Sequence, residues 1–344
     1  MEALPGTTLM TLFTESELTA DNGDIYHQKI DRFIDSSTLK ALSKIKPWRG
    51  ILQIALEWFA IAGGIILCET YWHPVLYIAT VIWIGSRQGG LAVMMHESTH
   101  YRLLPNRKWN DWVGEVFAAW PIFLTVYAYR HNHWAHHRRP NTPEDPDWRR
   151  KENNVHFEYP KSGLHMIFIT LKYWLGIYAI KLVTDLNQAV KLPAQLKYPR
   201  LLLYTGVVIA SIIFDFWLGL LIYWIVPFFT HFMWIVYVRG VAEHHGGIED
   251  HDDLLGKTRH IEANFLERLF IAPNYIHVHI GHHLYPSVPF YNLRELQRLL
   301  MLNPDYARRA HVTKGYIGLV MELLDSDSKQ SITTLKPADA TQER

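Results

Sequence analysis

The chain has 344 residues, of which 49% are hydrophobic and 19% are charged, and its formal net charge is +1. This balance gives no sign of a nucleic-acid-binding protein, since such proteins usually carry a basic excess. The single cysteine, Cys68, excludes an intrachain disulfide framework and cysteine-ligated zinc or iron–sulfur sites, so any metal site must use the 20 histidines, Asp and Glu.

Three apolar blocks, each with a single charged residue, dominate the rest of the composition. They run from Ile51 to Cys68, from Pro74 to Met95 and from Leu201 to Val238. A helix crosses the apolar core of a bilayer with about 20 residues. The third block has 38 residues, and the segment around Asp215 near its middle is predicted to form a turn. The sequence therefore predicts four transmembrane helices in two hairpins, at residues 51–68, 74–95, 201–214 and 217–238.

Basic residues are segregated between these predicted spans. Residues 1–50 hold six Lys or Arg, residues 96–200 hold fifteen and residues 239–344 hold twelve, whereas the short links at 69–73 and near 215 hold none. With four spans, all three basic segments lie on one side, which the positive-inside rule makes cytoplasmic. The pattern favours a multi-pass membrane protein with both termini in the cytoplasm, in a bacterial inner membrane or its equivalent, over a soluble protein with buried helices.

The remaining segments suggest one domain, at residues 46–325. A polar cytoplasmic segment is expected before it, at 1–45, and a polar disordered tail after it, at 326–344. Two apolar but interrupted stretches, Val113–Tyr129 and Leu164–Ile180, lie between the hairpins. We expect them to lie at the membrane surface or under a cytoplasmic cap, because a single crossing by either would destroy the charge segregation.

The histidines form clusters with helical spacing. His96 and His100 follow the second span and would lie one turn apart on one helix face. The pattern H-x-x-H-H occurs twice, at residues 133–137 and 279–283, and Glu243-His244-His245 follows the last span. Because the second and fourth spans run in the same direction, all four clusters can meet at one cytoplasmic site.

Nine imidazoles in these clusters are too many for one ion and suit two ions with four or five ligands each. Neutral imidazole binds iron, copper, nickel and zinc. A redox-active iron pair is favoured, since a zinc hydrolase needs only three or four ligands. The segment HESTH also fits the H-E-x-x-H pattern of zinc proteases, but a protease leaves the two H-x-x-H-H boxes unexplained. A metal transporter would need polar residues along the spans, where only Glu57 and Arg87 are available.

The three histidine boxes, the last of which continues as HHLYPSVPFYNLREL, resemble those of the membrane fatty acid desaturase superfamily over roughly residues 50–305. The resemblance implies an all-α integral membrane fold, with four transmembrane helices in two hairpins and a helical cytoplasmic cap that holds two Fe²⁺ ions. It also implies nine iron ligands: His96, His100, His133, His136, His137, His244, His279, His282 and His283.

Further residues are expected around these ligands. Glu97 and Glu243 are predicted to fix the tautomer of a liganding imidazole. The other candidates are histidines beside the ligands and the acidic residues after the second box: His131, His245, His277, Asp145 and Asp147. Four residues before His244, where acyl-CoA desaturases carry Asn, this chain has Gly240, which argues against close kinship with that branch.

Such a site implies an O₂-dependent oxidation of an unactivated C–H bond in a hydrophobic substrate. Removal of a second hydrogen gives an alkene, whereas return of a hydroxyl gives an alcohol, and the ligands are the same for both. We predict a desaturase of fatty acyl chains, with a lipid or carotenoid hydroxylase or ketolase as the alternative. The chain lacks the His-Pro-Gly-Gly motif of a cytochrome b5 domain, so the expected electron donor is a separate ferredoxin or cytochrome b5 type protein. Basic residues such as Arg138 and Arg149 could dock it, or could instead form a solvated surface that faces lipid head groups.

Overall fold

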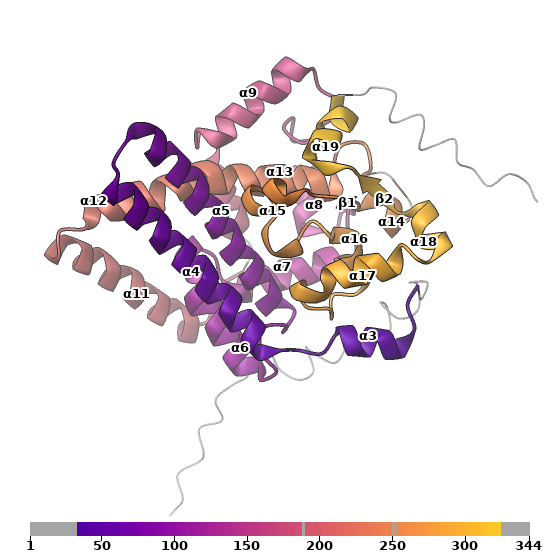
Figure 1. Cartoon of the computed structure of the whole chain (residues 1–344), viewed down its shortest axis with the longest axis horizontal. Helices are drawn as coiled ribbons and strands as arrows, with labels where there is room; N and C mark the ends of the chain where they lie inside the picture. Colours follow the sequence, from indigo (N-terminus) through magenta and orange to yellow (C-terminus); the bar gives the residue numbers. More distant parts are fainter. Residues whose placement is uncertain (1–32, 188–189, 250, 252, 325–344) are drawn as a thin grey trace, which may run out of the picture.

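The computed structural model describes residues 33–187, 190–249, 251 and 253–324, and these residues are mostly helical (Figure 1). Most of the predicted N-terminal segment 1–45 and all of the predicted tail 326–344 lie outside the described residues. The first described helix, α3 (Ser36–Leu42), is capped by the Asp35 side chain, which accepts hydrogen bonds from the backbone N–H groups of Ser37 and Thr38.

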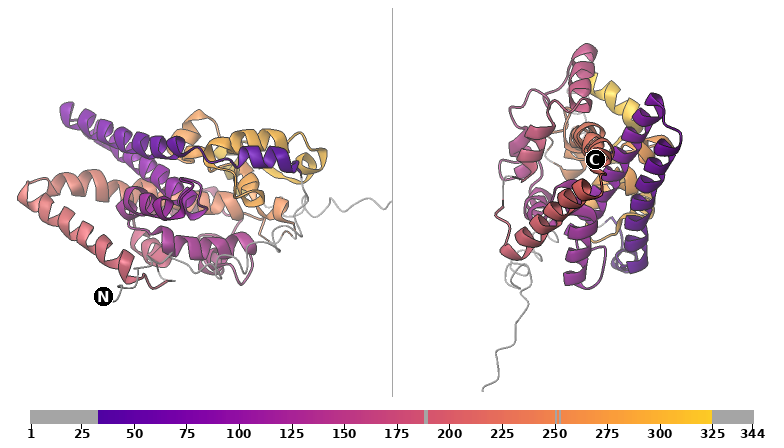
Figure 2. Two further views of the ribbon diagram at one scale, coloured as in Figure 1. Left: turned by 90° about the horizontal axis from the view of Figure 1, so that it is seen from below. Right: turned by 90° about the vertical axis from the view of Figure 1, so that its left-hand side faces the viewer.

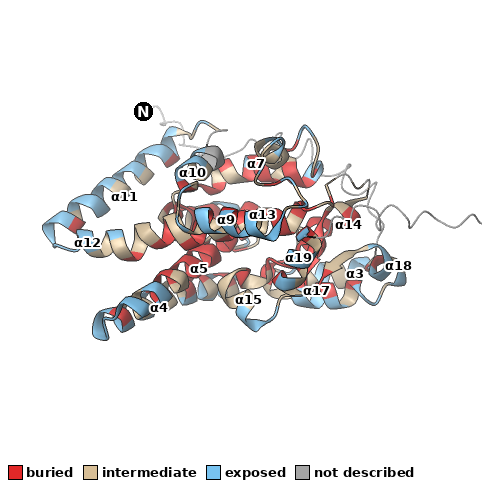
Figure 3. Ribbon diagram, turned by 90° about the horizontal axis from the view of Figure 1, so that it is seen from above, coloured by how far each residue is buried: buried red, intermediate tan, exposed pale blue. Residues whose placement is uncertain are grey.

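The first helical hairpin consists of α4 (Pro47–Thr70) and α5 (Pro74–Thr99). Each helix begins at a proline, which suits the first helical position because the N–H that proline lacks would have no partner there. The outer face of α4 is exposed, whereas α5 is buried along most of its length (Figure 3). Helix α5 therefore forms the centre of the fold and delivers its last turn, with His96, to the interior.

The second hairpin begins with α11 (Ala194–Ile213) and turns at Asp215, whose φ is 54°. A long helix, Trp217–His244, returns from this turn. Its consecutive segments, two of which are π-helical, are α12 (Trp217–Leu220), η3 (Leu221–Ile225), η4 (Phe228–Phe232) and α13 (Met233–His244). The two hairpins extend toward one end of the molecule, and the C-terminal helices gather at the other (Figures 1 and 2).

Three helices of the described residues are long and apolar enough to cross a membrane: Pro47–Thr70, Ala194–Ile213 and Trp217–His244. Their outward faces expose large apolar side chains, including Phe59 (74% exposed) and Leu202 (74%), as expected for a surface that faces lipid. The second predicted span, at residues 74–95, corresponds to α5, which has 26 residues but includes polar ones such as Arg87 and Gln88 and is not among these three. The structure thus supports a helical membrane protein with three candidate spans.

Each of the two interrupted apolar stretches between the hairpins is divided among more than one short helix. The first stretch is interrupted at Phe123, where φ is 60°, and the second at Gly176, where φ is 76°. The helices of this segment are α6 (Arg107–Gly114), η1 (Glu115–Ala119), η2 (Trp120–Ile122), α7 (Val126–Arg138), α8 (Pro146–Lys151), α9 (Gly163–Trp174) and α10 (Ala179–Asn187).

The C-terminal part folds into short helices around a small parallel sheet, in which β1 (Arg259–Ile261) pairs with β2 (His311–Thr313). Arg259 is fully buried and donates hydrogen bonds to the carbonyl oxygens of Ala242 (2.9 Å) and His245 (2.8 Å), which ties this sheet to the end of α13. The helices are α14 (Leu254–Lys257), α15 (Phe265–Phe270), η5 (Pro273–Tyr275), α16 (His279–Leu284), η6 (Phe290–Asn292), α17 (Leu293–Leu300), α18 (Pro304–Arg309) and α19 (Gly315–Leu324).

Candidate metal centre

Four helix segments bring the nine histidines together in two groups. Within each group the potential ligand atoms all lie within 4.8 Å of one another. The first group has five members: His96, His100, His133, His137 and His282. The second group has four: His136, His244, His279 and His283. These nine residues are the nine that the sequence analysis singled out, and they divide into sets of five and four.

Helical spacing explains how each H-x-x-H-H box contributes to both groups, whereas His96 and His100 both belong to the first. In α7, His133 and His137 lie one turn apart and join the first group, while His136 faces the second. Helix α7 begins at Val126 because Thr125 caps it, accepting a hydrogen bond from the N–H of Ala128. In α16, His279 and His283 are likewise one turn apart and join the second group.

The ring nitrogens that converge are the Nε2 atoms. In the first group, Nε2 of His133 lies 3.0 Å from that of His100 and 2.9 Å from that of His137. In the second, Nε2 of His244 lies 3.0 Å from that of His136 and 2.8 Å from that of His279. A neutral ring that carries its proton on Nδ1 presents a lone pair on Nε2. Each group therefore directs several lone pairs to one point, where they could bind a metal cation.

Several buried ring nitrogens lack a hydrogen-bond partner among the described residues. Both ring nitrogens of His96 are in this state, and so are the Nδ1 atoms of His279, His282 and His283. Leaving a buried polar atom unpaired costs about 1–3 kcal/mol. A metal bound at the Nε2 side would give Nε2 of His96 its missing partner, since imidazole is a good ligand for redox metals, whereas the three Nδ1 atoms face away from such a metal.

Burial also sets the charge of these rings. Desolvation, followed by repulsion from neighbouring imidazoles and cations, lowers the pKa of His282 to about 3. The same two causes hold the pKa values of His133, His137, His279 and His283 well below the usual range. The rings are therefore neutral at physiological pH, the state in which imidazole binds a metal.

Asp145 orients one of the candidate ligands. Its Oδ2 lies 2.8 Å from Nδ1 of His136, and its Oδ1 accepts a hydrogen bond from the N–H of Asp147 at the start of α8. Oδ2 also accepts from the N–H of Asn141 (3.0 Å), whose side chain donates to the carbonyl oxygen of His244 (3.1 Å). Asn141 is a supporting residue that the sequence analysis missed; its position after the second box, in the same loop as Asp145, is the only signal for it.

The two glutamates predicted to orient histidines differ from each other. The carboxylate of Glu97 accepts a hydrogen bond from the backbone N–H of Phe290 (3.0 Å), which ties the end of α5 to the segment after α16, and its role in orienting an imidazole stays a prediction. Glu243 pairs with Arg239 (2.7 Å) and has its other oxygen 3.7 Å from Nε2 of His279, at the edge of the second group.

The remaining predicted neighbours lie around the groups or away from them. His245 stacks on Trp148 with an interplanar angle of 1° and lies 3.6 Å from Glu249. His277 is buried and donates from Nδ1 to the carbonyl oxygen of Ile261 (2.8 Å). His131 is exposed on α7, and the structure does not bring it to either group.

The sequence matches the fatty acid desaturase family over residues 70–314. A dihydrorhizobitoxine desaturase from Bradyrhizobium elkanii is 31% identical and covers 79% of this chain and 81% of its own length. The chain belongs to the fatty acid desaturase family. It is therefore an oxidoreductase, and the resemblance inferred from the histidine boxes is confirmed. An sn-1 oleoyl-lipid 12-desaturase from Arthrospira platensis is 25% identical over 71% of each chain. A chloroplastic omega-6 fatty acid desaturase from Spinacia oleracea is 23% identical over 76% of this chain and 61% of its own length.

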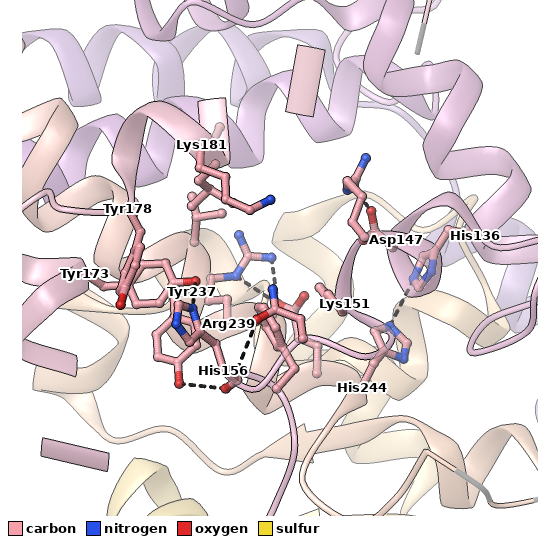
Figure 4. A pocket seen from close by; sticks show the side chains of 18 of the residues that line it. His136, Asp147, Lys151, His156, Tyr173, Tyr178, Lys181, Tyr237, Arg239 and His244 are labelled. Carbon is pink, nitrogen blue, oxygen red and sulfur yellow. Dashed lines mark hydrogen bonds and ion pairs between the residues drawn. The ribbon is translucent and has the colours of Figure 1, made fainter. Parts of the chain in front are cut away.

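A cavity of about 620 Å³ reaches the histidines of this desaturase (Figure 4). It lies between α5, α7, α13, the segment after α8, and helices α9 and α10. Its size is within the range of about 300–1,000 Å³ that is typical of small-molecule sites. Five candidate ligands from both groups contribute to its lining: His96, His133, His136, His244 and His279. A substrate in the cavity would therefore lie against both histidine groups.

Proposed function

We propose that this desaturase is a membrane-bound di-iron enzyme that uses O₂ to introduce a double bond into a fatty acyl chain. The observation that supports two ions is the division of nine histidines, eight of them buried, into groups of five and four, each with converging Nε2 atoms. His96, His100, His133, His137 and His282 would hold one iron. His136, His244, His279 and His283 would hold the other.

The protein's own part in the reaction is to bind and orient. When bound, the iron pair supplies the oxidation of an unactivated C–H bond by O₂. Asp145 fixes the ring plane of His136 through Nδ1, which presents Nε2 to the second group. Ala92, one turn before His96 on α5, and Met95, the residue before it, give the cavity an apolar wall beside the histidines. This wall excludes water and holds a hydrocarbon segment close to the reacting centre.

Desaturation is favoured over hydroxylation because the named relatives are desaturases, two of them of oleoyl lipids or omega-6 fatty acids. A lipid or carotenoid hydroxylase or ketolase is the alternative that the same ligand set allows. The first relative is named for a different substrate, dihydrorhizobitoxine. We therefore expect the cavity of each protein to determine its substrate.

For the membrane topology, we propose that α5 is a fourth span beside the three candidate helices. At 1.5 Å per residue its 26 residues reach about 39 Å, enough to cross the apolar core. Four spans in two hairpins place both termini and all histidine boxes on the cytoplasmic side, where the basic segments lie. Exposed basic residues there, such as Arg138 and Arg149, would bind an acidic ferredoxin or cytochrome b5 type donor.

Product analysis and metal content test this function together. Cells that express the chain should contain a lipid two mass units lighter than its precursor, and the purified protein should bind about two irons. We expect His136→Ala and His283→Ala to lose iron and at least about 99% of product, since neighbouring ligands act as a unit. His131→Ala, on the exposed side of α7, is the matched control and should behave as wild type.

Two results would contradict the proposal. Undiminished product from both ligand variants would remove the histidine groups from the reaction. A product sixteen mass units heavier than its precursor, with no alkene, would replace desaturation by the hydroxylase alternative.

A further inference from the structure

The outer face of α9 is apolar and exposed. Four large side chains recur there at the spacing of one helix face, and each is between 46% and 66% exposed: Leu164, Ile167, Phe168 and Leu171. The opposite face packs inward with Ile169 and Tyr173, which are 3% and 4% exposed. An exposed apolar stripe on a helix that is anchored on its other face marks a contact with a second apolar surface.

Helix α19 repeats this pattern. Its exposed apolar side chains again follow the spacing i, i+3, i+4 and i+7: Ile317, Val320, Met321 and Leu324. The residues of its inner face are apolar too, and they are buried: Tyr316, Leu319 and Leu323. A helix that is apolar on all sides is either enclosed by protein or in contact with lipid. Because the described residues cover only one side of α19, its other side calls for an apolar partner.

The two stripes are close to each other. The backbone N–H of Lys161, just before α9, donates a hydrogen bond to the carbonyl oxygen of Leu323 (3.4 Å). A Cβ at Gly163 would lie 3.7 Å from Cδ2 of Leu324. Figure 1 shows the end of α19 beside the beginning of α9. We call the eight exposed side chains of the two helices the α9–α19 surface.

The far end of α9 packs on the middle of a candidate membrane span, Trp217–His244. Nε1 of Trp174 donates a hydrogen bond to Nδ1 of His231 (3.1 Å), and a Cβ at Gly176 would lie 2.7 Å from the carbonyl oxygen of Phe229. At 1.5 Å per residue the span is about 42 Å long, and His231 lies about 20 Å from either end. An apolar core of about 30 Å includes this point wherever it is placed along the helix. The end of α9 is therefore at the depth of the bilayer.

The charges near α9 also suit a lipid surface. Residues 161–184 contain three lysines and no Asp or Glu. Lys172 is exposed at the edge of the α9 stripe, where a long side chain can reach the head groups while the helix lies among acyl chains. Anionic lipids attract such lysines. The chain after Leu324 is a poor alternative cover, since residues 325–344 include only Ile332 and Leu335 as large apolar residues.

We propose that α9 and α19 lie at the boundary of head groups and acyl chains, on the histidine side of the bilayer, with the α9–α19 surface in contact with phospholipid acyl chains. The inner face of α9 carries Tyr173, which lines the cavity that reaches the histidines. A single helix therefore separates lipid from this cavity. The surface adds to the proposed function and does not depend on it, because lipid contact requires neither iron nor turnover.

Spin labels on single cysteines test this contact. The only cysteine, Cys68, is buried, and Cys68→Ser provides a background without a native thiol. Ile167→Cys and Met321→Cys are labelled one at a time in the full chain, in nanodiscs of phosphatidylcholine and phosphatidylglycerol. Collisions of each label with O₂, which concentrates among acyl chains, are compared with collisions with a water-soluble nickel chelate. We expect the ratio of O₂ to nickel collisions to be roughly tenfold higher at both sites than at a label in water, because a helix of this kind lies about 5–10 Å below the head groups.

Reference labels set the two limits of the measurement. Leu202→Cys lies on the exposed face of α11 and should report lipid, whereas Arg308→Cys, exposed on α18, should report water. Lys172→Cys is the matched control within α9, because it lies at the edge of the stripe, and its ratio should fall below that of Ile167→Cys. A label that lowers the melting midpoint of the protein is replaced by one at Leu171 or Ile317, which belong to the same stripes.

Two results would overturn the assignment to lipid. One is nickel access at Ile167 and Met321 equal to that at Arg308, which would place both helices in water. The other is low access to both reagents, which would indicate cover by protein, either a second copy or a terminal segment. A lipid-like ratio in a chain that forms no desaturated product would overturn the proposed function alone, and product formation with a water-like ratio would overturn only the lipid contact.

Discussion

Two buried polar clusters of the desaturase differ in how their polar atoms are satisfied. Between α4 and α5, the Glu57 carboxylate accepts hydrogen bonds from Gln53 (2.8 Å), Asn274 (3.0 Å) and Arg87 (3.1 Å). Both of its oxygens are thus paired within the protein. At the other end of α5, both ring nitrogens of His96 lack a partner among the described residues. Nε of Arg87 also lacks a partner among the described residues, but the charges of this cluster are paired within the protein, which suits it to hold helices together, whereas His96 offers both ring nitrogens to a ligand.

The Glu57 cluster also holds the segment of the chain that leads into the last histidine box. Arg87 donates to the carbonyl oxygen of Leu269, and Asn274 bonds to Glu57, so both ends of the segment 269–274 are attached to the first hairpin. Five residues after Asn274, the chain enters α16 at His279. The close approach requires Gly90, since a Cβ there would lie 2.4 Å from the Glu57 carboxylate. The cluster therefore positions the last histidine box without contacting a metal.

The largest effect that distinguishes the clusters is expected for Arg87→Met. This change leaves the Glu57 carboxylate buried beside α5 without its cation, which typically costs about 3–5 kcal/mol. The melting midpoint of the detergent-solubilised protein should fall by many degrees. Iron content per folded chain should stay near that of wild type, because no candidate ligand is removed. His283→Ala should show the opposite pattern, with iron lost and a smaller change in melting.

The double variant Glu57→Gln with Arg87→Met is the control for this comparison. Removing both charges eliminates the unpaired carboxylate, so part of the lost stability should return. A single Arg87→Met variant that melts like wild type would contradict a structural role for the pair. An unchanged melting midpoint accompanied by loss of iron would place the pair in the metal site instead.

The histidine groups could be predicted from sequence because their geometry is local. His133, His136 and His137 must project from one helix at fixed angles, and the direction of the spans brings α5 and α13 to the same side. Their division into groups of five and four depends on which face of α7 meets α16. That contact is tertiary, so the sequence could supply the number of candidate ligands and an expectation of four or five for each ion, but not which histidine joins which group.

Contacts between distant segments could not be predicted in the same way. Glu97 lies beside His96 in sequence, yet its hydrogen bond goes to the backbone of Phe290, 193 residues away. Glu57 and Arg87 were recognised only as isolated charges in apolar blocks, because their third partner, Asn274, lies far along the chain. The limited apolar character of α5 has the same origin, since burial among protein helices permits polar residues that lipid would exclude.

An intermediate effect is expected at Asp145, whose carboxylate contacts the candidate ligand His136 of the second histidine group. Asp145→Asn removes the charge that orients His136 through Nδ1 (2.8 Å) but keeps the size of the side chain. Loss of such a partner typically costs about 10–100-fold in metal affinity. Competition with a chelator should show this loss as faster or more complete removal of iron.

Asp147→Asn is the matched control, because this neighbouring carboxylate pairs with Arg150 and not with a histidine. It should lose little iron affinity. Equal losses in the two variants would indicate that the loop as a whole, and not the contact with His136, supports the ligand.

The smallest expected effect concerns Glu115, whose carboxylate has one oxygen that is paired, as in the Glu57 cluster, and one that is unpaired, as at His96. One oxygen accepts a hydrogen bond from the N–H of Tyr127 (3.0 Å), and the other lacks a partner among the described residues. Burial raises the pKa of Glu115 from 4.5 to about 7. The folded protein thus holds a proton that the unfolded chain releases above about pH 4.5, so the stability from this proton is lost as the pH rises toward 7.

Melting midpoints measured from pH 5 to 8 should fall over this window by an amount equivalent to on the order of 2 kcal/mol, and Glu115→Gln should remove that part of the slope. Glu158→Gln, at an exposed position, should leave the slope unchanged. A slope that persists in Glu115→Gln would mean that the carboxylate is satisfied when ionised, like Glu57 and unlike the histidine groups.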